Sequence, residues 1–137
     1  MPDYGPFLDD TAVYIALRNT SYMDMETGDI KPNAFLLRER DLGPANGISL
    51  IVCDDPPKIE DLPALAPGLK SKVCGIDAII VGDIRSLGPG LDVVEDAEHH
   101  AYIKGLPHIE AEDKAEARKA TTLSELLARR CRHMDRL

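Results

Sequence analysis

The stretch Val73–Pro107, VCGIDAIIVGDIRSLGPGLDVVEDAEHHAYIKGLP, decides the fold of this chain. Its β-branched run from Ile76 to Ile84 is typical of a strand buried on both faces, so we predict the central strand of a sheet there. The cluster Leu87–Gly90 requires a turn, because its glycines permit positive φ and its proline lacks a backbone donor. Residues 91–94 and 100–104 are the next extended segments. The middle of the chain is therefore expected to be rich in strands.

Two further strands are predicted nearer the N-terminus. Residues 11–18, TAVYIALR, alternate apolar and other side chains with the period of two that a half-buried strand shows. Residues 48–53, ISLIVC, follow the turn signal Asn46-Gly47. Residues 59–66 have helical spacing, but two prolines limit that helix to a turn or two. These segments complete a sheet of about five short strands.

The C-terminal segment 110–134 is predicted to be a long amphipathic helix. Its apolar residues recur at intervals of three or four: Ala117, Ala120, Leu123, Leu127, Cys131 and Met134. Acidic residues near its start and arginines near its end favour the helix dipole. If this stripe packs on the sheet, burial of Leu123 and of Leu127 contributes about 1.5–3 kcal/mol each. The expected fold class is therefore α+β, in one domain over 1–137 with a flexible lead-in at 1–10.

The composition of the chain indicates which classes of partner are unfavourable and which cellular compartment is expected. The chain has 16 Lys and Arg against 24 Asp and Glu, a formal net charge of −8, which disfavours generic binding to nucleic acids or anionic membranes. It contains no apolar run of about 18 residues and no basic segment followed by an apolar one, so neither a membrane span nor a signal peptide is expected. The three cysteines are widely spaced and form no C-x-x-C pair. Reduced thiols in the cytoplasm are the expected state.

Histidines and cysteines provide few candidates for metal binding or nucleophilic catalysis. His99, His100 and His108 lie near several carboxylates, but adjacent residues on a strand point to opposite faces. The H-x-x-x-H type of spacing is missing as well, so no metal site is predicted. The apolar neighbours of Cys74 favour a buried structural cysteine over a nucleophile. The chain also lacks a G-x-S-x-G motif and a phosphate-binding glycine loop.

Five short motifs carry a resemblance to a known group of proteins. In order they are Tyr14-x-x-x-Arg18, Ala34-Phe35, Gly47-Ile48-Ser49, His100-Ala101 and Gly105-Leu106-Pro107. This order resembles a family of small bacterial proteins that begin with an aromatic–arginine strand and end with an HA-x-I-x-GLP segment before a helix. The resemblance covers roughly residues 13–130, and that family implies no established activity.

The chain also resembles ADP-ribosyltransferase-like folds, in which polar residues on successive strands bind a dinucleotide. The resemblance implies that Arg18 would contact the pyrophosphate of NAD and Ser49 would lie near the nicotinamide amide. Glu98 or His100 would then stabilise an oxocarbenium-like ribose in the transition state. The cofactor implied by this likeness is NAD.

Two functional hypotheses from different classes follow. The first is a non-enzymatic protein-interaction or regulatory module without a cofactor, such as one component of a small bacterial gene pair. It is motivated by the acidic charge and by a C-terminal helix whose basic end would meet an acidic partner. The second is a small NAD-consuming enzyme that uses Arg18, Ser49 and either Glu98 or His100.

Overall fold

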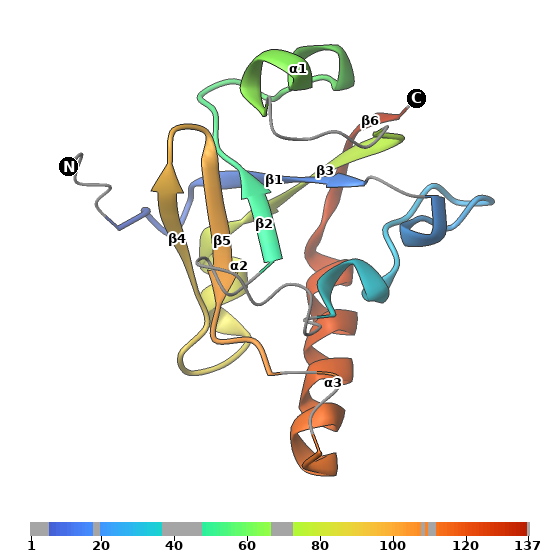
Figure 1. Ribbon diagram of the computed structural model, residues 1–137, viewed down its shortest axis with the longest axis vertical. Coiled ribbons are helices and arrows are strands. Elements are labelled where there is room, and N and C mark those ends of the chain that lie inside the picture. Colours follow the sequence, from blue (N-terminus) through green and yellow to red (C-terminus); the bar gives the residue numbers. More distant parts are fainter. Residues whose placement is uncertain are drawn as a thin grey trace.

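The computed structural model describes residues 6–17, 20–36, 48–66, 73–107, 109 and 112–136. These residues form six strands, three α-helices and three short 3₁₀ helices (Figure 1). In chain order the elements are β1 (Ala12–Leu17), η1 (Thr20–Tyr22), η2 (Pro32–Phe35), β2 (Ile48–Ile51), η4 (Ile59–Asp61), α1 (Leu62–Leu65), β3 (Gly75–Ile80), α2 (Val81–Ser86), β4 (Asp92–Ala97), β5 (His100–Lys104), α3 (Lys114–Arg130) and β6 (Arg132–Arg136).

All six strands belong to one antiparallel sheet in the order β4-β5-β2-β1-β3-β6. The pairs β2–β5 and β1–β3 are in continuous register, whereas β1 and β2 share the registered pair Tyr14 and Ile51. Figure 1 shows β1 running across β2 instead of alongside it. The sheet thus consists of two three-stranded halves that meet at Tyr14 and Ile51. The predicted α+β class, with short strands and a long C-terminal helix, is confirmed.

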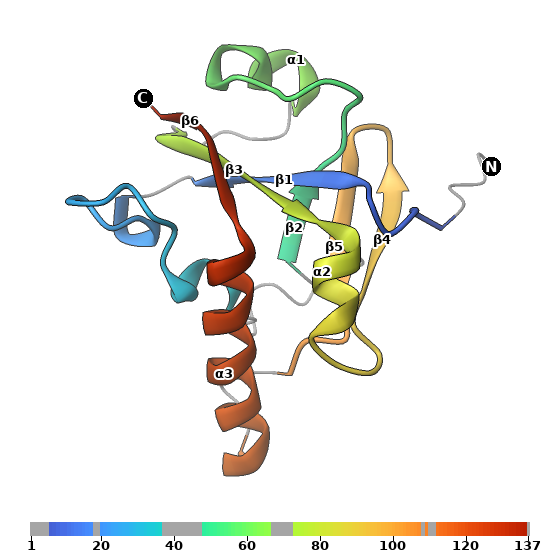
Figure 2. The same ribbon diagram turned by 180° about the vertical axis from the view of Figure 1, so that it is seen from behind.

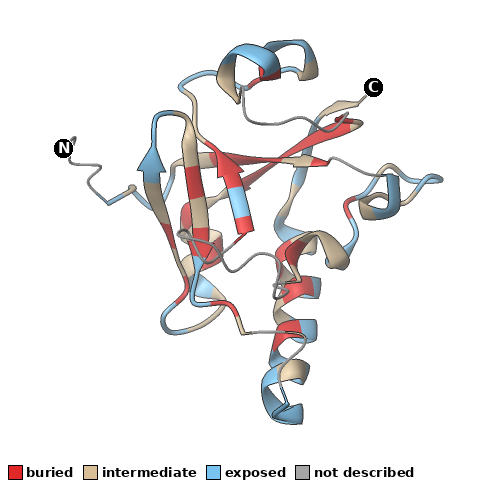
Figure 3. Ribbon diagram, in the orientation of Figure 1, coloured by how far each residue is buried: buried red, intermediate tan, exposed pale blue. Residues whose placement is uncertain are grey.

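The two faces of the sheet bury separate apolar clusters. The larger cluster lies between the sheet and α2, α3 and η2, and includes Val13, Leu50, Ile79, Ile103 and Leu127. The smaller cluster lies on the opposite face beneath η4 and α1. Figure 3 shows buried residues through the strands and along the part of α3 nearest the sheet, whereas the first turns of α3 are exposed.

The predicted central strand is shorter than its apolar run and is not central. β3 ends at Ile80, and α2 begins directly at Val81 (Figure 2). The backbone nitrogens of Val81 and Gly82 donate to the carbonyls of Thr11 and Asp9, at 2.9 and 2.7 Å. A Cβ atom on Gly82 would lie 2.7 Å from the Asp9 carbonyl oxygen, so this close approach requires glycine. The apolar residues Val81 and Ile84, which follow Ile80, belong to helix α2 and are buried there. Their β-branched composition had predicted a continued strand.

The C-terminal segment is also divided differently from the prediction of a helix over 110–134. α3 begins after Asp113, whose side chain accepts a hydrogen bond from the Ala115 nitrogen at 2.9 Å, and it ends at Arg130. Cys131 has an extended backbone, and β6 then pairs with β3. Met134 therefore lies on a strand, 39% exposed, and does not extend the helical stripe. In this segment, hydrogen bonding to β3 is favoured over continuation of the helix.

Candidate binding site

The residues predicted for the NAD-consuming hypothesis lie at the β2–β5 part of the sheet. Ser49 is exposed on β2 opposite Tyr102, and His100 lies opposite Ile51, so Ser49 and His100 share one face of neighbouring strands. Glu98 lies in the turn between β4 and β5 with its side chain 85% exposed. Arg18 falls outside the described residues. The structure thus brings Ser49 and His100 onto one face and leaves Glu98 in solvent.

The neighbouring histidines make contacts that stabilise the β4–β5 turn. The prediction placed His99 on a strand, but it lies in the turn, with a φ of 61°. Its Nδ1 lies 2.9 Å from the Val52 carbonyl oxygen. His100 Nδ1 lies 2.5 Å from Asp96 Oδ1, and Asp96 is the extra residue of a β-bulge in β4. Within the described ranges, no group of three histidine, cysteine or carboxylate side chains is arranged to hold a metal ion. His108 lies outside them.

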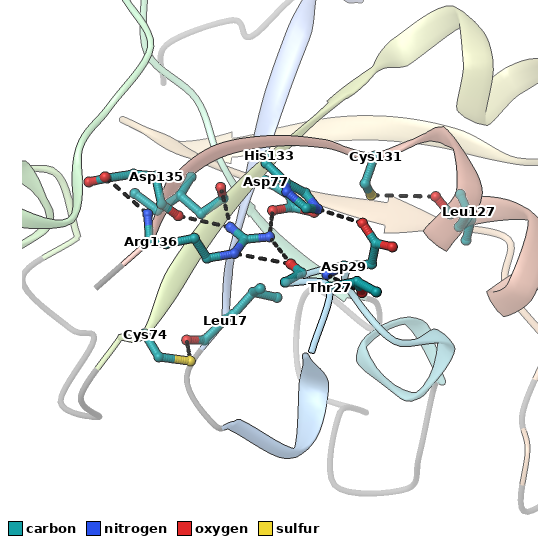
Figure 4. A network of polar contacts seen from close by, with 12 residues as sticks. Leu17, Thr27, Asp29, Cys74, Asp77, Leu127, Cys131, His133, Asp135 and Arg136 are labelled. Carbon is teal, nitrogen blue, oxygen red and sulfur yellow. Dashed lines mark hydrogen bonds and ion pairs between the residues drawn. The ribbon is translucent and has the colours of Figure 1, made fainter. Parts of the chain in front are cut away.

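A different set of polar residues gathers around Asp77, where β3, β6, the end of α3 and the turn at 23–30 meet (Figure 4). Asp77 follows the apolar Ile76 in β3, and because side chains alternate, it points to the face covered by α3. Its side chain is fully buried, at 0% exposure. A carboxylate in this position is costly unless it is paired, so its partners are informative.

Arg136 on β6 is the counter-ion of Asp77. Its Nη2 lies 2.6 Å from Asp77 Oδ1, although the contact lacks the angles of an aligned hydrogen bond. The same guanidinium donates to the carbonyl oxygens of Gly28, at 2.6 and 3.1 Å, Ile76, at 3.1 Å, and Asp135, at 2.8 Å. Gly75 leaves room for this side chain, since a Cβ there would lie 2.9 Å from Arg136 Nη1. Arg136 therefore connects β6 to β3 and to the turn at 23–30.

Pairing with Arg136 does not satisfy the whole Asp77 carboxylate. Oδ2 is buried and has no hydrogen-bond partner among the described residues. Burial raises the pKa of the Asp77 carboxyl above its usual value, while the Arg136 guanidinium opposes that shift. A buried carboxylate with an unused oxygen and a raised pKa is a typical feature of functional sites.

His133 and Cys131 lie beside this carboxylate. His133 is opposite Asp77 in the β3–β6 ladder, and its Nε2 lies 2.8 Å from Asp29 Oδ1. Cys131 Sγ donates to the Leu127 carbonyl oxygen at 3.4 Å, and burial followed by the nearby Asp77 charge raises the pKa of the thiol. The cysteine therefore stays protonated and is a poor nucleophile, even with a histidine near it in sequence.

A cleft of about 500 Å³ opens at this point. Its polar lining consists of Asp29, Asp77, Glu125, Arg129, Cys131 and His133, and Ile30, Pro32 and Ala128 supply the apolar part. We call it the Asp77 cleft. Its volume is in the range of small-molecule binding sites. Polar groups from four separate elements converge there, as they do in a built binding site.

Sequence reasoning missed the Asp77 cleft. One signal was present: Asp77 is the acidic residue within the apolar run GIDAIIV, where a charge needs a partner. That partner is Arg136, which the sequence analysis placed just after a helix and not in a strand.

No helix in the described part of the chain has the length and apolar character needed to cross a bilayer. Comparison with protein-family models, with curated proteins and with solved structures found no match to this chain.

Proposed function

We propose that the protein is a non-enzymatic interaction module that binds a protein partner at the Asp77 cleft. The observation that carries this proposal is the Asp77 carboxylate: it is fully buried, its Oδ2 has no hydrogen-bond donor among the described residues, and Asp77 is one of the residues that line the cleft. An unsatisfied buried acceptor is costly to the free protein. A partner that supplies the missing donor would recover part of that cost on binding.

The contacts of the neighbouring groups support binding over catalysis. The Cys131 thiol has a raised pKa and donates to the Leu127 carbonyl, and His133 is paired with Asp29. An activated nucleophile would need a lowered pKa or a base within hydrogen-bond reach. Binding requires neither a lowered pKa nor a base, and Cys131 and His133 contribute to the polar lining of the cleft.

The C-terminal helix takes part in this proposal through one end. Its apolar stripe is used by the protein's own core, where Leu127 is fully buried and α3 packs on η2. Glu125 and Arg129, near its C-terminal end, line the Asp77 cleft. A partner is therefore expected to contact the last turns of α3 and not its apolar face.

Sheet edges are poorer candidates for binding a partner. The edge strands β4 and β6 each carry a register shift, at Asp96 and at Met134, and both are rich in charged residues. Bulges and charges are the usual protection against strand addition. The bulged edges favour the cleft over β-augmentation as the binding surface.

The three cysteines, Cys53, Cys74 and Cys131, form no disulfide. Free thiols support the proposal that this module is located in the cytoplasm, as a regulatory component of a small bacterial gene pair would be.

Site-specific photo-crosslinking tests the proposal. A benzophenone side chain is placed at Glu125 or at Arg129, which line the cleft, and at Glu116 or Arg118, which are exposed on the first turns of α3. Irradiation in cells of the source organism is expected to give one adduct of the same mass from both cleft positions and from neither control position.

Excess unmodified protein should suppress this adduct, because a specific site is saturable. Adducts of equal yield at all four positions, or no adduct at the two cleft positions, would contradict the proposal. The crosslinked partner, identified by mass spectrometry, should also bind the purified protein directly.

An NAD-consuming enzyme is the second candidate, and the shared face of Ser49 and His100 on β2 and β5 is the observation in its favour. The leading proposal predicts no turnover of NAD by purified protein over many hours, even with a cell lysate as the source of acceptors. Turnover that falls more than about tenfold in Ser49→Ala, His100→Ala and Arg18→Ala, but not in Glu125→Gln, would replace the leading proposal with this one.

A further inference from the structure

We infer that the Asp77 cleft binds a cationic side chain, the guanidinium or ammonium group of an arginine or lysine on the partner. This inference rests on the proposed function and adds the chemistry of recognition. It follows from the hydrogen-bonding capacity of the groups in the cleft and from their charges.

Arg136 has no donor left for the second oxygen of Asp77. A guanidinium has five N–H donors in a fixed geometry. In this protein two donate to the Gly28 carbonyl, one each to the Ile76 and Asp135 carbonyls, and one faces Asp77 Oδ1. Asp77 Oδ2 therefore requires a donor from another group, and the described residues supply none.

The remaining lining of the cleft attracts positive charge. Asp29 and Glu125 add two carboxylates to Asp77, and the carboxyl end of the 17-residue helix α3 lies at the cleft wall. The carbonyl groups at a helix C-terminus carry partial negative charge and favour cations. The net charge of −8 for the whole chain also favours a basic partner, in place of the acidic partner that the basic end of the C-terminal helix suggested from the sequence.

The basic side chains already at the cleft either have partners or are exposed to solvent. Arg136 is saturated, as described above, and His133 is paired with Asp29 at 2.8 Å. Arg129 is exposed and lies one helical turn from Glu125. It is a like charge that an incoming cation must approach, so removal of Arg129 should strengthen binding, whereas removal of Glu125 should weaken it.

Nuclear magnetic resonance titration of the full chain with peptides of the form acetyl-Ser-Gly-X-Gly-Ser-amide tests the inference. X is arginine, lysine, citrulline or norleucine, so that citrulline keeps the shape of arginine without its charge. The arginine and lysine peptides are expected to cause saturable shifts in the amides of residues 128–133. Their affinity should exceed that of citrulline and norleucine peptides by about tenfold.

Substitutions within and outside the cleft provide the matched comparison. Glu125→Gln should weaken the arginine peptide by roughly threefold, and Arg129→Gln should strengthen it by a similar factor. Glu116→Gln, on the exposed first turn of the same helix, should leave the affinity unchanged. Asp77→Asn should abolish the preference for arginine over citrulline. Because Asp77 also pairs with Arg136, the Glu125 and Arg129 variants keep the test valid if Asp77→Asn fails to fold.

Equal binding of arginine and citrulline peptides, or shifts that do not saturate, would overturn the inference. A position-specific photo-crosslink combined with that result would leave the interaction module standing and remove only its cationic ligand. If free agmatine binds about tenfold more tightly than the arginine peptide, the cleft is a small-amine site, and the assignment to a partner side chain is wrong.

Discussion

Replacing Arg136 with methionine is expected to lower the free energy of unfolding by about 3 kcal/mol at pH 7, because a fully buried carboxylate loses its counter-ion. Asp77 has 0% exposure, and Arg136 retains 23%, which places the expected loss at the lower end of the values for buried pairs. The substitution also removes the donors to the Gly28 and Ile76 carbonyls. Urea denaturation followed by circular dichroism measures the change.

Arg132→Met is the matched control for this prediction. Arg132 lies on the same strand and is exposed, so its loss should change stability by less than about 0.5 kcal/mol. Arg136→Lys should give an intermediate loss, because an ammonium cannot reach the Asp77 carboxylate and the Gly28 carbonyl at once. Equal stability of Arg136→Met and Arg132→Met would show that the ion pair contributes nothing to the fold.

The loss in Arg136→Met is expected to decrease as the pH falls. Burial already raises the pKa of Asp77 in the wild-type protein, and removal of the guanidinium raises this pKa further. A carboxyl with a higher pKa in the folded state binds its proton more tightly there than in the unfolded chain, where it titrates at about pH 4. Stability from this group is therefore complete below that pH and is lost as the pH rises through the folded pKa.

A double variant isolates this titration from that of other carboxyls. The pKa of Asp92 is lowered, opposite to Asp77, by hydrogen bonds from Arg85 and from the Val93 backbone that outweigh its burial, so its stabilising effect is lost as the pH falls. Asp77→Asn/Arg136→Met keeps the Asp92 contribution and lacks the Asp77 one. Its stability difference from Arg136→Met should be large at pH 7 and near zero at pH 4. A difference that does not change with pH would contradict the assignment.

Leu127→Ala is expected to cost about 3–4 kcal/mol, the other large effect. Leu127 is fully buried where α3 meets the sheet and η2, and truncation of a leucine there removes apolar contacts and leaves a cavity. Leu123, one turn earlier on the same stripe, is only partly buried, so Leu123→Ala should cost about 1 kcal/mol. Both losses can be measured from the shift of the urea-denaturation midpoint, with the same slope used for all variants.

The difference between the two leucines tests how α3 contacts the sheet. Leu126→Ala is a second control, because Leu126 lies on the same helix and is also only partly buried. If all three variants lose the same stability, the packing of α3 is uniform along its length and Leu127 is no anchor. A larger loss in Leu123→Ala than in Leu127→Ala would show that the helix sits in a different register on the sheet.

Strands β1, β2, β4 and β5 could be predicted from the sequence because their signals are local. Alternating or continuous apolar residues bounded by turn residues indicate a strand wherever it pairs. The amphipathic helix could also be predicted from a local pattern, the apolar stripe that includes Ala120 and Leu127. Both residues are buried, as that pattern requires. The same local reasoning extended β3 into α2 and α3 into β6, since apolar periodicity does not show where one element gives way to the next.

The candidate site could not be predicted, because its parts come from separate regions of the chain. Ser49 and His100 were chosen as polar residues on strands, and they share a face but line no part of the Asp77 cleft. Asp77 and Arg136 become neighbours only when β6 pairs with β3 at the edge of the sheet. No pattern within either segment specifies that pairing.

The amino-acid sequence by itself determined the α+β class, most of the strands and the amphipathic helix, because burial of apolar side chains imposes a period on each element separately. The tertiary structure alone decided the strand order, the conversion of residues 132–136 into β6 and the convergence of polar groups at Asp77. These features depend on contacts between residues far apart in the chain, and the free energy of such contacts is set by the whole packed domain. The buried Asp77 carboxylate, placed by that packing beside Arg136 and lining a cleft, is the feature from which the proposed function follows.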